Sequence, residues 1–509
     1  MARRQVRKRP RTRNVQEVVK SPAVSLRARY DAAMFSPEDV AHWKQIDNLS
    51  SDAANNPKTR KILRERCRYE VANNSYAFGA GMKLANLTIG TGPTPNILTG
   101  DKKLNSELEW LLAEWMNSIN LTDKLATLRM DKYQSGEGVA IIRRNPVIPG
   151  YGLTTDLLPF ECDRLKNPDN ATSKEAANPL DGVELDKFGN PAAYWISNRH
   201  PGDSGGFSLS DMASVRFPAY DVVHYYSKTR SEQHRGIPEL TSCLKLFAQL
   251  RRVTLAVAQA FETAANVAII FSTDLPSMGS AAAMNPYDRV PIVRGTGLVL
   301  PEGWKPEQMK AEQPTTTFAM FRREILTEIG QCLQMPCNVI TGDSSEYNFA
   351  SGRLDQQVFF KSLDVERERI VRTIITPLVQ HALQELEEYS FYDGSSRINA
   401  IAKRYMRVKR REGWIMGIPA IEWRFPMIQH VDPIKEANAH KVLYELGAES
   451  LYDVCAAYGK DVEDVQEQKA REQANLIDLT KKYKLPEQAL IAFKDNENES
   501  TADRGDSET

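Results

Sequence analysis

The sequence predicts an α+β fold that is mainly α-helical. Long segments at residues 58–85, 236–266 and 317–386 carry apolar residues three and four positions apart, which is the spacing of one helix face. Residues 145–226 are instead rich in Pro, Gly, Asn and Asp and contain short strand-like runs such as Tyr194–Ile196. Long helices beside one region of short strands are typical of an α+β protein.

Residues 317–335 are predicted to form a helix. Its apolar stripe consists of Phe318, Phe321, Ile325, Ile329 and Leu333. Pro336 is expected to end it, because proline has no amide hydrogen and disfavours a helical residue before it. The polar residues that follow, together with Gly342 and Asp343, are typical of a loop.

A second, longer helix is predicted after this loop, with Ser351 as its N-cap. Phe359, Leu363 and Ile370 lie on one side of it. Some 35 residues would span roughly 50 Å. Pro377 lies inside this segment and is expected to kink or divide the helix.

The first third of the chain is predicted to be mostly helical as well. A helix over 58–85 follows Asn56-Pro57, and further helices are expected over 101–133. The core residues of the latter are Leu104, Leu108, Leu111, Leu112, Trp115, Leu121, Leu125 and Leu128. Branched residues at 139–142 predict a short buried strand, and 222–226 predicts another.

Another long helix is expected to start at Gly236-Ile-Pro238 and to run to about Asn266. Its predicted stripe is Leu240, Leu244, Phe247, Leu250, Val257 and Phe261. Three short apolar runs follow, at 267–271, 290–293 and 298–300. Three isolated strands cannot build a core alone, so their edges need partners, which neighbouring copies in a ring would supply.

The last part of the chain is less regular. Residues 390–422 give mixed segments that end in the strand-like run 421–425. Three short helices are predicted between residues 431 and 473. Residues 495–509 are polar and rich in acidic residues, and are predicted to be disordered.

The composition favours a protein of two or three core-forming regions that does not cross a membrane. The chain has 509 residues, of which 41% are hydrophobic, and no apolar run approaches the length of about 18 residues that a membrane span requires. No apolar run follows the basic start, so no signal peptide is expected. The six cysteines are scattered without zinc-ligand spacing, and the simplest interpretation is reduced, buried thiols.

Charge is unevenly distributed. The whole chain has 66 basic and 66 acidic residues, but residues 1–13 contain seven basic residues and no acid, which leaves seven excess acids on the remainder. The basic residues are Arg3, Arg4, Arg7, Lys8, Arg9, Arg11 and Arg13. Such an arm is either a solvated tail or a contact for DNA or scaffold proteins. The acidic remainder is compatible with a channel, because strong phosphate contacts would hinder a sliding polyanion.

No enzyme is predicted, and no catalytic residue, metal site or cofactor. The run Gly202-Asp-Ser204-Gly-Gly206 matches the nucleophile segment of chymotrypsin-like proteases, but His42 lacks the family's setting and no matching Asp segment follows. A flexible loop is the preferred interpretation. Gly-x-x-x-x-Gly-Lys-Ser/Thr and His-Glu-x-x-His are absent from the sequence.

Four passages resemble the portal proteins of tailed phages, lambda type. Residues 335–353 pair Met-Pro with an Ile-Thr-Gly-Asp loop and an Ala-Ser-x-Arg helix start, and residues 50–92 end in Gly-Thr-Gly. The other two are Arg235-Gly-Ile-Pro-Glu-Leu240 and Asp432-Pro-Ile-Lys-Glu-Ala437. The resemblance covers most of residues 26–480.

The resemblance implies a portal fold with an α/β wing, a helical stem, a small β-containing clip and a helical crown, assembled as a ring. The implied segments are a disordered basic arm (1–25), the N-terminal wing (26–235), a stem helix (236–266), the clip (267–316), a second stem helix (317–335), a tunnel loop (336–350), a long wing helix with return strands (351–435), the crown (436–494) and a disordered tail (495–509).

The resemblance also implies a function: a ring of twelve subunits at one capsid vertex, through which a separate terminase ATPase packages DNA and from which the DNA is later ejected. The DNA-facing tunnel-loop residues would be Thr341, Gly342, Asp343, Ser344, Ser345, Glu346, Tyr347 and Asn348. Expected partners are other copies of the chain, double-stranded DNA bound without sequence preference, the terminase large subunit, the major capsid or scaffold protein and the head-tail adaptor. The expected location is the virion, with the host cytoplasm during assembly.

An alternative from a different class is a cytoplasmic DNA-binding or capsid-scaffold adaptor that uses the basic arm. A ring would elute as a very large particle in gel filtration, whereas an adaptor would elute as a single chain. A serine hydrolase using Ser204 is the third and weakest candidate, and a fluorophosphonate probe would detect it.

Overall fold

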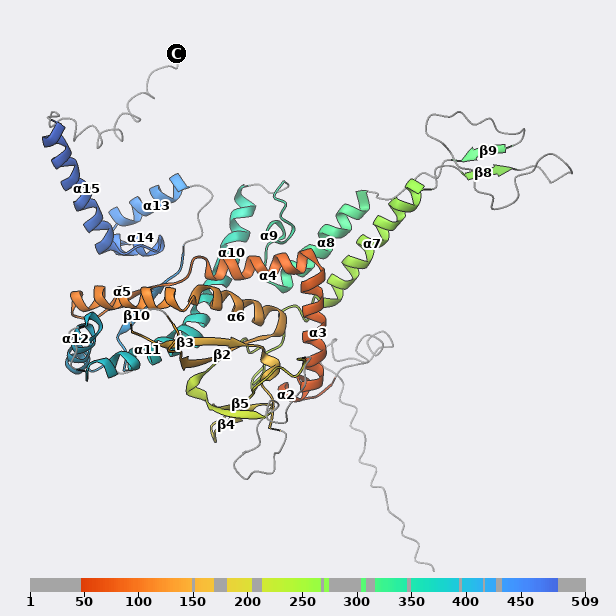
Figure 1. Cartoon of the computed structure of the whole chain (residues 1–509). Helices are drawn as coiled ribbons and strands as arrows, with labels where there is room; N and C mark the ends of the chain where they lie inside the picture. The colour runs from red at the N-terminus through yellow and green to blue at the C-terminus, as the bar shows by residue number, and fades with distance from the viewer. Residues whose placement is uncertain are drawn as a thin grey trace, which may run out of the picture. The chain divides into compact units, whose positions relative to one another are not determined.

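The structure is a computed structural model that describes residues 47–148, 152–168, 181–203, 213–266, 270–273, 304–307, 316–345, 349–392, 396–414, 417–426 and 433–483. The chain divides into two units, Met1–Ser50 and Ser51–Thr509. Every helix and strand below belongs to the second unit (Figure 1). Within the described residues, no helix is both long and apolar enough to cross a bilayer.

The N-terminal half alternates helices with short strands. In order, the elements are α2 (Ser51–Ala54), α3 (Pro57–Asn73), α4 (Ser75–Ile89), β1 (Thr94–Leu98), α5 (Lys102–Ser118), α6 (Leu121–Ser135), β2 (Glu137–Arg144), β3 (Thr155–Phe160), η2 (Cys162–Arg164), β4 (Val183–Leu185), β5 (Pro191–Ser197), β6 (Ser214–Pro218), η3 (Ala219–Asp221) and β7 (Val222–Tyr226).

The C-terminal half is dominated by helices. It contains α7 (Leu244–Asn266), β8 (Ile270–Thr273), β9 (Trp304–Glu307), α8 (Thr316–Cys332), α9 (Cys337–Thr341), α10 (Phe349–Ile370), the π-helical turn η4 (Val371–Ile375), α11 (Thr376–Tyr389), α12 (Arg397–Glu412), β10 (Ala420–Arg424), α13 (Pro433–Glu445), α14 (Leu451–Ala457) and α15 (Val462–Tyr483). The predicted α+β, mainly α class is confirmed.

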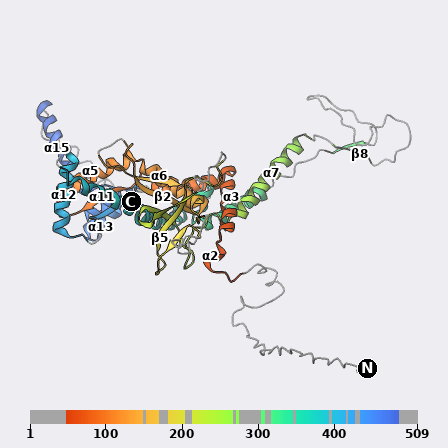
Figure 2. The ribbon, with the colours of Figure 1, turned by 60° about the horizontal axis from the view of Figure 1, so that its bottom comes forward.

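An antiparallel sheet of order β3-β2-β7 lies at the centre of the fold. Alternate residues of β2 point to opposite faces, as in any strand. Ala140 and Ile142 pack into the core formed with α5, α6, η4, α11 and α12. Val139 and Ile141 pack on the other face against Tyr194 and its neighbours from the second sheet, β4-β5-β6. Figure 2 shows α6, β2 and β5 in succession.

A second helical core joins segments that are far apart in the sequence. Buried apolar residues of α3, α4, the start of α7, α8, α9 and the first half of α10 form one cluster. The cluster includes Phe247 of α7, Ile329 of α8 and Phe359 of α10, which are each at most 1% exposed. α7 and α8, which flank residues 267–315, are therefore packed against α3 and α4 at their inner ends, meaning the first turns of α7 and the last turns of α8.

Several predicted elements are confirmed. The expected helices over 101–133 are α5 and α6, and all eight predicted core residues are buried. The predicted strands at 139–142, 194–196 and 222–226 lie in β2, β5 and β7. The long helix is divided as predicted, because Pro377 lies in the first turn of α11, directly after η4. Three helices, α13 to α15, occupy the C-terminal region.

The prediction of one helix over 58–85 was wrong, because the helix is broken at Asn74. Asn74 is extended (φ −122°, ψ 114°) and separates α3 from α4. Its amide caps α3 by donating to Glu70 O at 2.8 Å, and its side-chain oxygen caps α4 by accepting from Tyr76 N at 3.1 Å. The side-chain nitrogen lies 3.4 Å from Phe247 O, so a tertiary contact accompanies the break.

The predicted start of the next helix at Gly236 was also wrong, since α7 begins at Leu244. Residues 239–243 form turns, with Thr241 N donating to Pro238 O at 3.0 Å and Cys243 N donating to Leu240 O at 3.2 Å. Two members of the predicted stripe are not core residues, because Val257 is half-buried and Phe261 is 41% exposed.

Three boundaries around the predicted loop differ from expectation. The helix before it ends at Cys332 and not at Pro336, which is instead the N-cap of α9. Residues 337–341 are helical, so the segment after Pro336 is not all loop. The next helix begins at Phe349, which places Ser351 inside α10 and rules it out as the N-cap.

Other expectations have different outcomes. Residues 397–412, which were predicted to be mixed segments, form α12. The run at 421–425 is largely β10, which pairs antiparallel with β1. Of the three predicted strands after α7, only 270–271 is described, in β8, which pairs with β9. The runs at 290–293 and 298–300, the arm at 1–25 and the tail at 495–509 lie outside the described residues.

Two chain segments cross closely at Gly136 and Gly236. Gly136 lies between α6 and β2, and Gly236 lies in the segment before α7. A Cβ at Gly236 would lie 2.1 Å from Gly136 O. Gly136 has φ 91°, which favours glycine, and a Cβ there would lie 2.5 Å from the Ile237 carbonyl carbon. Only two glycines allow these backbones to approach so closely.

We predict that Gly236→Ala lowers the free energy of unfolding by about 1–3 kcal/mol, because the added methyl group forces the two backbones apart. The matched control is Gly79→Ala in α4, where a Cβ would meet no atom within 4 Å. The control should be neutral or stabilising by up to about 1 kcal/mol, since alanine favours helices. Denaturant unfolding measures both. Equal stability of the two variants would contradict the close crossing.

Candidate functional site

The predicted loop follows a helix end of the Schellman type. Met335 N donates to Gly330 O at 2.8 Å and Gln334 N donates to Gln331 O at 3.2 Å, with Gln334 in the left-handed region at φ 54°. A Cβ at Gly330 would lie 2.6 Å from Met335 O, so glycine permits the chain to turn back closely over α8. This turn directs α9 against α8 and α4.

The first part of the predicted tunnel loop is anchored by α9. Ile340 is buried in the helical core, and Lys83 of α4 donates to Val339 O. The helix ends at Gly342 with φ 73°, whose amide donates to Asn338 O at 2.9 Å. The chain then turns through Asp343, whose carboxylate accepts from Ser345 N at 2.9 Å. Residues 342–345 are exposed.

Among the described residues of this loop, Asp343 is the acidic one. Hydrogen bonds from Ser345 hold the pKa of Asp343 below its ordinary value, and the charges of Arg323 and Arg322 on α8 act in the same direction. The structure places Thr341 to Ser345 at the C-terminal end of α9 and in the turn that follows it. Glu346, Tyr347 and Asn348 lie outside the described residues, as do the arm residues Arg3 to Arg13, His42 and Ser204.

A buried carboxylate, Glu137, connects the central sheet to the segment that leads into α7. Its side chain is 0% exposed and accepts hydrogen bonds from Arg64 of α3, from Arg235 Nε at 3.0 Å and from Gly236 N at 2.9 Å. His224 Nε2 of β7 lies 2.9 Å from it. Burial alone would raise the pKa of Glu137, but the charges of Arg235 and Arg64 outweigh it and hold the pKa well below its usual range.

Arg235, which is itself 1% exposed, extends this network. Its guanidinium also donates to Leu165 O at 3.2 Å, to Cys162 O at 3.3 Å and to Asp181 O at 2.6 Å. Arg60 of α3 pairs with Asp181 as well. Arg235 thus connects the approach to α7 with η2, with Leu165 directly after η2 and with the segment before β4.

A second buried network ties α10 to the same sheet. Lys132 of α6 lies 2.5 Å from Glu366 of α10 and 3.2 Å from Glu239, which precedes α7. Tyr225 of β7 donates to Glu366, and Arg129 pairs with Glu239 at 3.0 Å. Burial lowers the pKa of Lys132, although Glu239 and Glu366 oppose this shift. These contacts connect α6, β7, α10 and the segment before α7 to one another.

Sequence reasoning missed both networks. Pairs such as Glu137 with Arg235 and Lys132 with Glu366 are far apart in the chain, and nothing local predicts their contact. One signal was present: Glu137 stands between two glycines and Arg235 directly precedes a third. A charged residue flanked by glycines indicates a place where backbones approach closely around it.

Two further groups of polar residues are structural. Glu161, Asp163 and His200 offer ligand atoms within 4.8 Å of one another, and no other such group was found among the described residues. Arg68 lies 2.6 Å and Arg64 lies 3.4 Å from Asp163, so arginines already balance its charge. We therefore assign no metal to this cluster.

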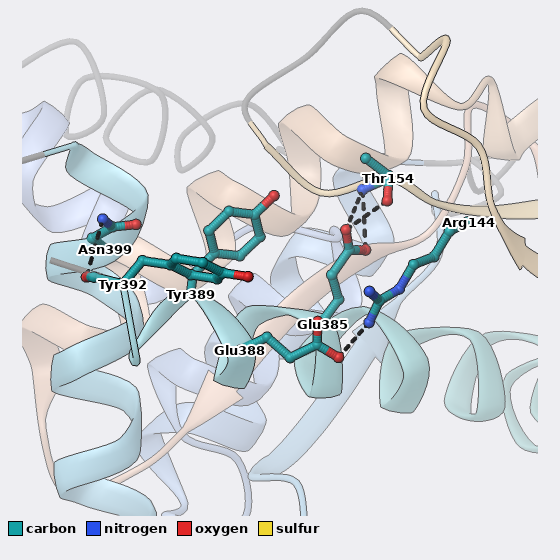
Figure 3. A pocket seen from close by; sticks show the side chains of 7 residues that line it. All are labelled: Arg144, Thr154, Glu385, Glu388, Tyr389, Tyr392 and Asn399. Carbon is teal, nitrogen blue, oxygen red and sulfur yellow. Dashed lines mark hydrogen bonds and ion pairs between the residues drawn. The ribbon is translucent and has the colours of Figure 1, made fainter. Parts of the chain in front are cut away.

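An open pocket of about 390 Å³ lies between α11 and the start of β3 (Figure 3). Glu385 points to the backbone of Thr154 and accepts from its amide at 2.8 Å, and also from Thr155 N at 2.8 Å. Arg144 pairs with Glu388. These polar groups pair with one another, and their contacts hold α11 against the start of β3. They do not converge on a position where a ligand could bind.

The class defined by these features is a mainly helical α+β protein whose long helices are anchored to a small sheet by buried ion pairs. Residues 38–367 match the family described as phage portal protein, lambda family. The match covers well over half of the chain, and the chain belongs to this family.

Individual relatives are distant. The chain is 24% identical over 342 residues to the probable portal protein of Halomonas phage phiHAP-1, a match that spans 65% of this chain and 61% of that protein. It is also similar to a chain in the virion of a native gene transfer agent (15% identity, 79% of this chain, 94% of that chain, TM-score 0.43) and to one in the neck of an empty particle (15%, 70%, 90%, TM-score 0.42). TM-scores below 0.5 are too low to transfer an assembly to this chain.

We predict that Glu137→Gln lowers the free energy of unfolding by about 3–5 kcal/mol, because Arg64 and Arg235 would lose the fully buried carboxylate that they share and keep only the partly exposed Asp163 and Asp181 as counter-charges. Thermal and denaturant unfolding measure the loss. The matched control is Glu388→Gln, since Glu388 pairs with Arg144 but both side chains are more than half exposed.

The control should change stability by less than about 1 kcal/mol, because exposed pairs contribute little. A loss at Glu137 as small as that at Glu388 would show that the buried pairs do not hold the sheet and helices together.

Proposed function

We propose that twelve copies of this chain form a ring at one vertex of a phage capsid. A separate terminase ATPase drives double-stranded DNA through the ring during packaging, and the DNA leaves by the same channel. Proposed partners are the terminase large subunit, the capsid or scaffold protein and the head-tail adaptor, and assembly takes place in the host cytoplasm. Membership of the portal family supports this proposal, and the family's role is structural, so we assign the chain no catalytic step.

The single observation that best supports a ring is that α10 has two apolar faces. Phe359, Leu363 and Ile370 are buried in the chain's own cores. On the opposite side, Leu354, Val358 and Val365 are 65%, 73% and 62% exposed. At about 100° per residue, these three lie within 40° of one another, and they form a second stripe. A helix that is apolar on both sides favours a partner on its open side.

The C-terminal helices lead to the same interpretation. α15 has 22 residues, all of them described, and none is buried. Leu476, Ile477 and Leu479 are 38%, 44% and 47% exposed. An isolated helix gains little stability from propensity alone and depends on packing. Contact with a neighbouring copy would supply that packing for α15.

We further propose that residues 341–348 face the DNA. The described residues Gly342 to Ser345 are small or acidic and exposed at the tip of a well-anchored turn. Asp343 is charged at neutral pH and repels phosphates, which limits sticking to a moving duplex. The basic residues of the arm, Arg3 to Arg13, are proposed contacts for DNA or scaffold proteins during assembly.

The ring is tested with Val358→Asp, which places a charge in the open stripe of α10. We expect wild-type protein to be found as a ring by mass photometry, and the variant to shift to the mass of one 57.4 kDa subunit with an unchanged circular dichroism spectrum. The control is Val147→Asp, since Val147 is 84% exposed and belongs to the segment between β2 and β3, not to α10. A monomeric wild type, or a ring in both variants, would contradict this interface.

The role of the loop is tested by replacing residues 343–348 with two glycines. Rings should still form, because Ile340 and Gly342 remain, but packaging of DNA into capsids should fall, because the exposed acidic turn that limits sticking to the moving duplex is removed. Normal packaging with intact rings would reject a DNA-facing role for the loop. Shortening the β4–β5 turn at Lys187 and Phe188, which is exposed, is the control and should leave packaging unchanged.

A further inference from the structure

Two cysteines lie where α7 begins and α8 ends. Cys243 directly precedes α7 and is 1% exposed, whereas Cys332 is the last residue of α8 and is half-buried. The two helices pack against each other, and both cysteines belong to the same helical core. The chain between them contains all of α7, β8, β9 and α8.

Cys332 is held against the turn that carries Cys243. Its Sγ lies 2.8 Å from Ser242 Oγ, which belongs to the residue next to Cys243, and 3.5 Å from Glu239 O in the same turn. Cys243 Sγ lies 3.5 Å from Leu240 O. Cys332 Sγ thus contacts the residue next to Cys243 in the chain and the backbone of the turn that ends at Cys243. A disulfide requires such proximity before any backbone movement.

The surroundings shift the pKa values of the two thiols in opposite directions. The interaction with Cys243 holds the pKa of Cys332 below its ordinary value, burial opposes this shift, and the hydroxyl of Ser242 supports it. The same interaction, followed by burial, raises the pKa of Cys243. Cys332 is the more accessible thiol of the two and the one that ionises more readily, which makes it the nucleophile of the pair.

We propose that Cys243 and Cys332 are a redox-active pair that closes to a disulfide by exchange with a small-molecule disulfide such as oxidised glutathione. The Cys332 thiolate attacks one sulfur of glutathione disulfide, and the second glutathione leaves as a thiolate. Cys243 then attacks Cys332 Sγ of the mixed disulfide and loses its proton to solvent, and the remaining glutathione leaves. Two protein thiols are oxidised and one disulfide is reduced to two thiols.

The bond would connect the inner ends of α7 and α8 covalently. Inside a cell the glutathione pool keeps such a pair reduced, and outside the cell it would be oxidised. The closed form restricts the relative movement of α7 and α8, through which β8 and β9 are attached to the rest of the chain. This inference depends on the contacts of the two cysteines and not on the proposed ring.

The experiment uses the purified full chain, incubated with oxidised glutathione or with dithiothreitol. After denaturation, iodoacetamide labels the free thiols and peptide mass spectrometry locates the disulfide. We expect one cross-linked species, Cys243 with Cys332, and labelled thiols at Cys67, Cys162, Cys337 and Cys455. The melting temperature of the oxidised protein should rise by at least about 5 °C, because the bond closes a long loop.

The variants are Cys332→Ser and Cys337→Ser. Cys337 is the matched control because it is also half-buried, lies close by at the start of α9 and accepts from Thr327 Oγ1 at 3.1 Å. Cys337→Ser should form the disulfide and show the full shift, and Cys332→Ser should show neither. A lasting glutathione adduct on Cys332 of the wild type, a different cross-link, or no reaction would overturn the proposal.

Discussion

The rest of the structure depends on one buried carboxylate. Glu137 lies at the start of the central strand and is enclosed by Arg64, Arg235 and His224. Removing a carboxylate and two guanidiniums from water costs several kcal/mol for each ion, and this cost is offset only because every partner is hydrogen-bonded. The pairing therefore selects one arrangement of α3, β2, β7 and the approach to α7. The Lys132–Glu366 network adds α10 to that arrangement.

This constraint explains why a small sheet can carry long helices. α7 and α8 share a core with α3 and α4 only at their inner ends, where Phe247 and Ile329 are buried. Farther out, Leu255 and Phe261 of α7 are exposed. Helices with so little packing of their own need a fixed base. The two ion networks and the crossing of Gly136 with Gly236 provide it, and the open stripe of α10 remains available for another subunit in the proposed ring.

The sequence predicted those parts of the fold that depend on local pattern. The helices with leucines at 104, 108, 111, 112, 121, 125 and 128 follow from periodicity, and β2 follows from the branched residues at 139–142. The break at Asn74 and the late start of α7 did not follow, because each depends on contacts with distant residues such as Phe247 and Glu137. α12 was missed although Ile401, Tyr405 and Val408 show helical spacing.

The candidate site was predicted in part. The resemblance to the portal family predicted the loop. The structure places Thr341 to Ser345 at the end of α9 and in the turn after it. The DNA-facing role stays a prediction. Leu354, Val358 and Val365 also show helical spacing in the sequence, but the sequence-based prediction placed the apolar side of this helix only at Phe359, Leu363 and Ile370. The buried pairs could not be found from one sequence, since a charge does not indicate its partner. Likewise, the motif around Gly236 was assigned to a helix start, although the structure gives it a role in close backbone contact.

The most direct test of this account is hydrogen–deuterium exchange at Gly236, whose amide donates to Glu137 at 2.9 Å. If the buried carboxylate holds the approach to α7 against the sheet, the Gly236 amide should exchange as slowly as the amides of β2, because both open only when the core unfolds. Exchange of Gly236 within seconds, while β2 stays protected for hours, would show that this segment opens independently and would contradict the account.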